Sequence, residues 1–104
     1  MPCNAGTPRL SPDEARAEAG GLESEGWTIG ETALERTFEF RNFNAAFGLA
    51  TRVALLAERE GHHPDLEIGW GRLRVRLTTH AIGGLSRNDL VMAAKIGRLH
   101  QPSS

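Results

Sequence analysis

The sequence predicts an α+β domain in which a four-stranded antiparallel sheet is covered on one face by three helices. The predicted element order is helix, two strands, helix, two strands, helix. Strands that arrive as hairpins, rather than singly between helices, favour an antiparallel sheet with its helices on one side. The length of 104 residues, with 39% hydrophobic and 24% charged residues, is typical of one globular domain. We expect this domain at residues 10–100, between flexible segments at 1–9 and 101–104.

The first helix and the first hairpin follow from local signals. Ser11-Pro12-Asp13-Glu14 is a capping box with proline at the first helical position, where a missing N–H costs nothing. This helix should end near Ala19, because Gly20-Gly21 follows. Residues 27–29 and 34–40 then alternate in polarity around a turn, which predicts two paired strands with one buried face.

A long helix is predicted next. Asn42 suits its N-cap, and Gly61 suits the left-handed residue that ends it. Apolar residues recur between these two positions at three- and four-residue steps, which is typical of a helix with one buried stripe. The stripe comprises Phe43, Phe47, Ala50, Ala54 and Ala57.

The second hairpin and the last helix complete the pattern. Residues 66–70 and 73–80 read as strands around Gly71-Arg72, and the second of them alternates between apolar and polar side chains. Ser86-Arg87-Asn88-Asp89 is a second capping signature and predicts a helix to about Leu99. The strand edges of such a thin domain invite pairing with another copy of the chain.

The charge balance and the length of the apolar runs exclude several classes of partner. Twelve basic and thirteen acidic residues give a net charge of −1, so no overall field attracts nucleic acid or anionic lipid. The longest apolar run, Val53–Ala57, is far shorter than the roughly 18 residues of a membrane span. Residues 1–8 lack the features of a secretory signal, and Cys3 is the only cysteine, so we expect a cytoplasmic protein without disulfides.

Histidines carry the strongest chemical signal. His62 and His63 follow the long helix, His80 ends the last predicted strand, and His100 falls in what reads as a solvated tail. An imidazole gains or loses a proton near neutral pH, so a histidine cluster in a cleft could act as general acid and base. A histidine after a helix could instead simply complement the helix dipole.

A metal site is the first alternative, because catalytic zinc can be bound by three histidines. Adjacent histidines in an extended segment point in opposite directions, and the sequence lacks a helical His-x-x-x-His pair. We therefore expect no metal. Purely structural interpretations also exist for Asp89 as a helix cap, for Glu58 as a solvated charge and for Trp27 as a core residue.

Three sequence segments form a motif when they are taken together: Glu58-Arg59-Glu60-Gly61-His62-His63-Pro64-Asp65, Leu77-Thr78-Thr79-His80 and Gly84-Leu85-Ser86-Arg87-Asn88-Asp89-Leu90. The combination of a double histidine before a proline, then Thr-His and then Leu-Ser-x-x-Asp is specific. It resembles the signature of the pterin-4a-carbinolamine dehydratase family. The resemblance covers roughly residues 10 to 99 and extends upstream through Gly26-Trp27 and residues 40–55.

The resemblance implies a small α+β domain that assembles as a homodimer or as a homotetramer formed from two dimers. It also implies an enzyme that dehydrates 4a-hydroxytetrahydropterin to quinonoid dihydropterin, without metal or organic cofactor. This pterin is left by aromatic amino-acid hydroxylases, so a functional link to such a hydroxylase is expected. No nucleic acid or membrane partner is expected.

By the family pattern, His62 and His80 would be the acid and base groups, and His63 would bind and orient the pterin ring while assisting as a base. The chain departs from the pattern at Ala81, where many members carry an acidic residue, and at Gly61, where some carry aspartate. The substrate-binding residues implied are Pro64, Thr79, Ala81, Asp89, Glu58 and Trp27.

The alternative function is a non-catalytic binding module on the same fold. Some family relatives bridge a transcription factor or help to assemble another enzyme. A member that has given up catalysis has no reason to keep three imidazoles, and this chain keeps all three. The enzymatic hypothesis therefore comes first.

Overall fold

The computed structural model describes residues 8–100 of the chain. Of the flexible segments predicted at residues 1–9 and 101–104, residues 1–7 and 101–104 lie outside this range. The elements in chain order are α1 (Pro12–Ala19), α2 (Gly21–Glu25), β1 (Thr28–Ile29), β2 (Leu34–Glu39), α3 (Phe43–Glu60), β3 (Asp65–Gly69), β4 (Arg72–Leu77), the 3₁₀ turn η1 (His80–Ile82) and α4 (Arg87–His100).

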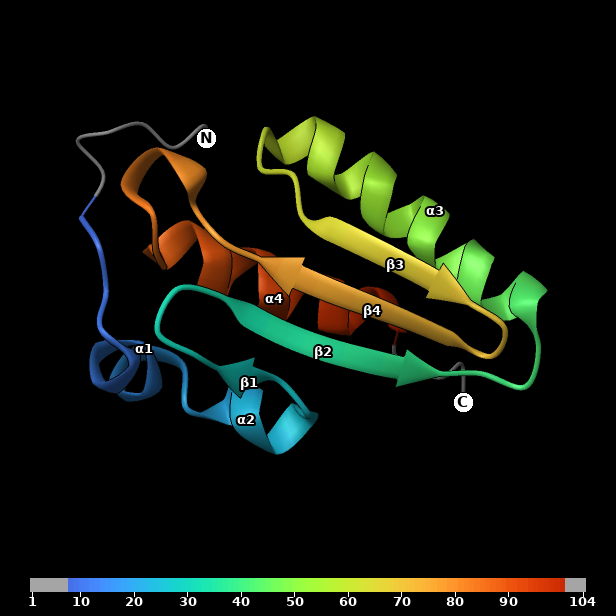
Figure 1. Cartoon of the computed structure of the whole chain (residues 1–104), viewed down its shortest axis with the longest axis horizontal. Helices are drawn as coiled ribbons and strands as arrows, with labels where there is room; N and C mark the ends of the chain where they lie inside the picture. Colours follow the sequence, from blue (N-terminus) through green and yellow to red (C-terminus); the bar gives the residue numbers. More distant parts are fainter. Residues whose placement is uncertain (1–7, 101–104) are drawn as a thin grey trace.

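The four strands form one antiparallel sheet in the order β1-β2-β4-β3 (Figure 1). β4 is central: Leu77 lies opposite Leu34 of β2, and Arg76 lies opposite Asp65 of β3. The two predicted hairpins are therefore present, and their long strands pair with each other. This register places the first residues of β3 beside the last residues of β4.

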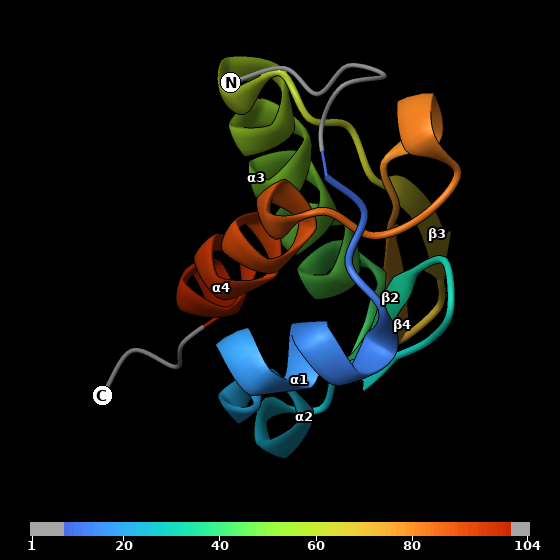
Figure 2. The same ribbon diagram turned by 90° about the vertical axis from the view of Figure 1, so that its left-hand side faces the viewer.

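Helices α3 and α4 lie together on one face of the sheet (Figure 2). α1 and α2 pack at the edge formed by β1 and also contact α4. Among the residues described, no helix covers the opposite face of the sheet. The predicted α+β layer arrangement is confirmed. No helix of the described segment 8–100 has the length and apolar character that a membrane crossing requires.

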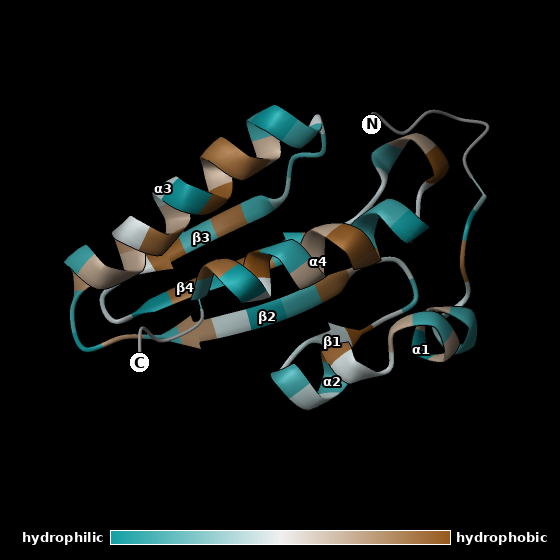
Figure 3. Ribbon diagram, turned by 180° about the vertical axis from the view of Figure 1, so that it is seen from behind, coloured by the Kyte–Doolittle hydropathy of each residue, from teal (hydrophilic) through white to brown (hydrophobic). Residues whose placement is uncertain are grey.

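Alternation along β4 separates the core from the open face of the sheet. Leu73, Val75 and Leu77 are fully buried on the helix side, where each contributes about 1.5–3 kcal/mol by leaving water. Figure 3 shows apolar and polar residues alternating along β4 and along α4, which lies against the sheet. Arg74 and Arg76, on the open face, form ion pairs with Glu35 of β2. The sequence prediction of one packed and one polar face is confirmed.

The N-terminal helix α1 ends at Ala19, as predicted, but a second helix follows it. Gly20 adopts a right-handed conformation (φ −59°) and links α1 directly to the short helix α2, which the sequence analysis did not predict. α2 ends at Gly26, where φ is +113° and the backbone N–H bonds back to the helix. A left-handed conformation favours glycine because other residues carry a Cβ that clashes there.

Two histidines also lie differently from the prediction. β4 ends at Leu77, so His80 opens the turn η1 and does not end a strand. His100 is the last residue of α4 and is partly buried, with its ring 4.7 Å from that of Phe38 and 5.6 Å from that of Phe40. Its interpretation as solvated tail was wrong, because α4 continues far enough to bring the ring against the sheet.

Candidate active site

The end of α3 positions the double histidine. Gly61 adopts φ +70° and donates its N–H to the carbonyl of Ala57 at 2.9 Å, which ends the helix as predicted. The N–H of His62 bonds to the same carbonyl at 3.2 Å. β3 begins a few residues later, opposite the end of β4. The two histidines are thereby held close to the point where β4 leaves the sheet.

A tight loop after β4 supplies the third histidine. The N–H of Thr79 bonds to the carbonyl of Gly84 at 2.9 Å, so the chain folds back on itself around η1. Gly83 closes that turn at φ +62°, and its N–H bonds to the carbonyl of His80. This return brings Ser86 and the start of α4 beside Thr79.

The two segments enclose a cavity of about 190 Å³. Its volume is below the roughly 300–1,000 Å³ typical of sites for drug-sized ligands, so it suits a small ring system. The three histidines predicted to act in catalysis therefore line one cavity, although His80 lies far from His62 and His63 along the chain. The lining residues are Gly61, His62, His63, Thr78, Thr79, His80 and Ala81.

His62 is held from behind by a buried carboxylate. Its Nε2 lies 2.5 Å from Oδ1 of Asp89, and the side chains are 8% and 0% exposed. The other carboxylate oxygen accepts the backbone N–H of Ser86 at 2.9 Å and the hydroxyl of Thr79 at 2.8 Å. Removing one partner of such a buried pair leaves a charge or polar group without compensation, so the pair fixes His62 firmly.

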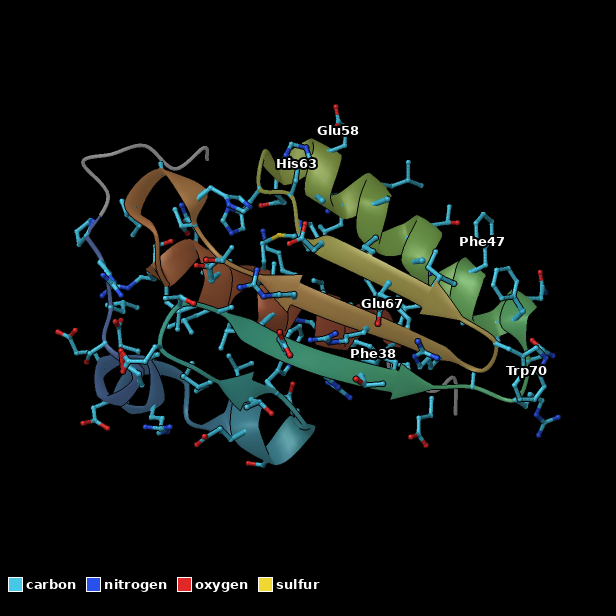
Figure 4. All side chains as sticks on the ribbon, in the orientation of Figure 1. Phe38, Phe47, Glu58, His63, Glu67 and Trp70 are labelled. Atoms are coloured by element: carbon cyan, nitrogen blue, oxygen red, sulfur yellow. The ribbon has the colours of Figure 1, made fainter. Side chains whose placement is uncertain are left out.

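His63 and His80 occupy wetter surroundings. The ring of His63 is 64% exposed and lies 3.0 Å from Glu58 Oε1, whose side chain is 82% exposed. Figure 4 shows this pair at the C-terminal end of α3. His80 is exposed on η1. These two histidines can reorient and exchange protons with solvent more easily than His62.

The other predicted site residues reach the cavity to different degrees. Thr79 and Ala81 line it. Asp89 does not line it but contacts the lining residues His62 and Thr79, and Glu58 contacts the lining residue His63. Pro64 is partly buried and is not among the lining residues.

Trp27 lies in the hydrophobic core, with its ring packed edge-on against Phe38 at 6.4 Å. The interpretation of this tryptophan as a core residue is confirmed, and the structure does not bring it to the cavity. Its place at the start of the first hairpin explains its burial.

Ser86 is a residue that the sequence analysis treated only as a helix cap. It is completely buried, and its Oγ lies 2.8 Å from Oγ1 of Thr79. The capping signature did mark the correct segment, because Asp89 accepts the N–H of Ser86 as a capping residue should. The signature could not reveal that the same carboxylate also holds His62.

An ion pair fastens the end of α3 to α4. Nζ of Lys95, the only lysine in the chain, donates to Oε1 of Glu60 at 2.7 Å. This hydrogen bond holds the pKa of the Glu60 carboxyl below its usual value. Because Glu60 directly precedes Gly61, the contact helps to keep the double histidine in place.

Two histidines at the cavity pair with carboxylates, and the three do not cluster around a common point. In the described range 8–100, no three histidine, cysteine, aspartate or glutamate side chains are placed to hold a metal ion. Two of the three cavity histidines are instead paired individually with a carboxylate. A histidine paired with a carboxylate is suited to accept, hold and release a proton.

Comparison with known proteins assigns the family. The sequence model of the family described as pterin 4 alpha carbinolamine dehydratase matches residues 8–99. A relative from Alkaliphilus metalliredigens, provisionally named a pterin-4-alpha-carbinolamine dehydratase, is 44% identical over 94% of this chain and 88% of its own. A similarly named relative from Cupriavidus pinatubonensis is 48% identical over 94% of this chain and 84% of its own. The chain belongs to the pterin-4-alpha-carbinolamine dehydratase family.

Solved structures share the same fold. The crystal structure of a transcriptional coactivator/pterin dehydratase from Brucella melitensis is 33% identical, with a TM-score of 0.79 over 90% of this chain and all of that one. A pterin dehydratase-like protein described as a RuBisCO assembly factor of the alpha-carboxysome is 22% identical, with a TM-score of 0.62 over 75% of this chain and 93% of its own. The second similarity concerns the fold alone.

Proposed function

We propose that this protein dehydrates 4a-hydroxytetrahydropterin to quinonoid dihydropterin by histidine general acid and base catalysis. In this role it would recycle the pterin cofactor of an aromatic amino-acid hydroxylase. The observation that carries the proposal is the single small cavity lined by His62, His63 and His80. Family membership independently supports pterin carbinolamine dehydration as the general activity.

The reaction needs two proton transfers and nothing else. The C4a–O bond breaks as a proton is delivered to the hydroxyl oxygen, so that water leaves. The proton on N5 is removed, and its bonding electrons form the new double bond between N5 and C4a. No electrons are gained or lost overall, so a positioned acid and a positioned base are sufficient.

The three histidines differ in burial and in hydrogen-bond partners, and these differences suggest a separate role for each in the two proton transfers. His62 is nearly buried and backed by Asp89, so it exchanges its proton in a fixed geometry at the inner wall of the cavity. His80, on the exposed turn η1, would serve as the opposite acid or base. His63, paired with Glu58 at the rim, would mainly bind and orient the ring.

The direct test is the rate of quinonoid dihydropterin formation. An independent phenylalanine hydroxylase supplies the 4a-hydroxy compound, and absorbance follows its dehydration with and without this protein. We expect the protein to accelerate the step well above the spontaneous rate, and the His80→Ala variant to lose most of the acceleration. Equal rates with protein and with buffer would refute the proposal.

A second candidate is a non-catalytic binding module. One solved relative is described as a transcriptional coactivator as well as a pterin dehydratase, and the fold alone is shared with a protein described as an assembly factor. This alternative predicts a protein partner recovered in stoichiometric amount, together with negligible dehydratase activity. Three imidazoles at one cavity favour the enzyme. We expect the assay to give activity, and its absence together with such a partner would reverse the order.

A further inference from the structure

A chain of polar side chains runs behind the cavity, inside the protein. It connects the end of α3, the loop after β4 and the start of α4 through Oγ of Ser86, Oγ1 of Thr79, the carboxylate of Asp89 and Nε2 of His62. Its four residues are between 0% and 7% exposed. Burying a polar group costs free energy unless the group is hydrogen-bonded. Apolar packing therefore does not explain why four polar side chains lie here.

The direction of each hydrogen bond follows from the number of protons available. Thr79 has one hydroxyl proton, and it donates that proton to Oδ2 of Asp89 at 2.8 Å. The 2.8 Å contact between Thr79 and Ser86 must then use the proton of Ser86. Both hydroxyls therefore point their protons toward the carboxylate.

Asp89 consequently acts as a hydrogen-bond acceptor toward both of these neighbours. Its Oδ2 accepts two hydrogen bonds, from the N–H of Ser86 and from the hydroxyl of Thr79. It also lies in the first turn of α4, where the helix dipole stabilises negative charge. A carboxylate that accepts hydrogen bonds at both of its oxygens requires Nε2 of His62 to be the donor in the 2.5 Å contact.

A helix cap alone does not account for this network. Capping requires one oxygen of Asp89 on the N–H of Ser86, and that contact is present. The hydroxyl of Thr79 adds a second donor to the same oxygen from a different segment, and the hydroxyl of Ser86 orients it. These two hydroxyls leave the carboxylate's other oxygen to His62.

We propose that Thr79 and Ser86 are positioning residues which, through Asp89, hold neutral His62 in the tautomer that carries its proton on Nε2. Nδ1 is then the nitrogen that gains and releases the proton during turnover. This inference deepens the proposed dehydratase function, and its catalytic part rests on that function. The tautomer itself is a property of the protein alone.

Nitrogen NMR of the full chain labelled with ¹⁵N-histidine tests the tautomer without any substrate. At a pH where His62 is neutral, we expect Nε2 at the frequency of a protonated ring nitrogen and Nδ1 at that of an unprotonated one. The opposite pattern would mean that Asp89 carries the proton, and it would overturn the proposal. The His62→Gln variant assigns the signals by removing them.

Variants at Thr79 separate positioning from packing. Thr79→Val keeps the shape and removes the donor, whereas Thr79→Ser keeps the donor. We expect Thr79→Val to shift the nitrogen frequencies of His62 toward mixed tautomers and to lower kcat about 10-fold or more, with KM less affected. Thr79→Ser should restore both readouts to a large extent. Equal tautomer spectra in Thr79→Val and the unaltered protein would overturn the proposal.

The Ser86→Ala variant probes the outer link of the chain, and we expect a smaller change of the same kind, because Thr79 keeps its own proton for Asp89. Matched controls are Thr37→Val and Ser24→Ala, which alter exposed residues on β2 and α2 and should leave the tautomer and kcat unchanged. If the unaltered chain shows the Nε2–H tautomer but no dehydratase activity, the proposed function fails while the tautomer assignment stands.

Discussion

Two histidine–carboxylate pairs lie at the same cavity, one inside the protein and one at its rim. His62 and Asp89 are 2.5 Å apart with side chains 8% and 0% exposed, whereas His63 and Glu58 are 3.0 Å apart with side chains 64% and 82% exposed. The buried side chains of the inner pair cannot replace their hydrogen bond with bonds to water, whereas the exposed side chains of the outer pair can. Identical chemical groups therefore provide a fixed proton carrier at one position and an adjustable contact at the other.

Replacing the inner histidine should have the largest effect on activity. We expect His62→Ala to lower kcat by about 10² to 10⁴, the usual contribution of a positioned proton carrier. His63→Ala should cost less in kcat and more in KM, because the proposed role of His63 is to bind the ring. Steady-state dehydratase kinetics on both variants measure the difference. Equal losses in kcat for the two variants would contradict the proposal that the inner and outer pairs have different roles.

Breaking the inner pair should also have the largest effect on stability. We expect Asp89→Ala to lower the free energy of unfolding by about 3–5 kcal/mol, because the buried partners of the carboxylate lose their acceptor. Urea denaturation measures this value.

The matched control for that experiment is Asp13→Ala, which removes a carboxylate that is 97% exposed and paired with Arg16 on the surface of α1. Its expected cost is about 0–1 kcal/mol, as for other surface ion pairs. A cost for Asp89→Ala as small as that of the control would show that the inner pair does not hold the site together.

The outer pair should respond weakly to the loss of its carboxylate. We expect Glu58→Gln to change the free energy of unfolding by less than about 1 kcal/mol and to raise KM only a few-fold. Because the pair is exposed, added salt should reduce even this difference. Measuring KM at low and at high salt checks the prediction. A large, salt-independent effect would place Glu58 in direct contact with the substrate.

His100 extends the comparison to a histidine that packs against aromatic rings. Burial, followed by the nearby charges of Arg36 and Arg52, lowers the pKa of His100 below its usual value. The unfolded chain therefore takes up this proton first as pH falls, so the stability contributed by neutral His100 is present above about pH 6.5 and lost below it.

The His100→Phe variant should lose that part of the pH dependence. Urea unfolding at about pH 8 and about pH 5.5 measures it, with a smaller difference expected for the variant than for the unaltered protein. The effect should be the smallest of those considered. An undiminished difference would mean that other groups account for the pH dependence of stability.

Local signals were sufficient for most of the architecture. The capping box at Ser11, the N-cap at Asn42 and the terminator at Gly61 appear where the sequence predicted them. The alternation along β4 likewise predicted its buried face. These features depend on residues that are only a few positions apart, so they can be predicted from the local sequence.

Local signals did not predict features that depend on contacts with distant segments. Gly20-Gly21 marks the end of α1 correctly, but it gave no indication of α2, which begins directly after Gly20 and packs against β1. His100 follows the last apolar residue of α4 and reads as tail, yet the rings of Phe38 and Phe40 hold it. In both cases contacts with distant segments decided the conformation.

The amino-acid order specifies which groups are available: three imidazoles, a capping aspartate and two hydroxyl residues near the ends of elements. Their pairing comes from folding, which makes Asp89, 27 positions after His62, its partner and adds Ser86 and Thr79 to the network. The physical reason is that a hydrogen bond depends on distance in space, and folding brings these segments together through packing of the sheet against α3 and α4.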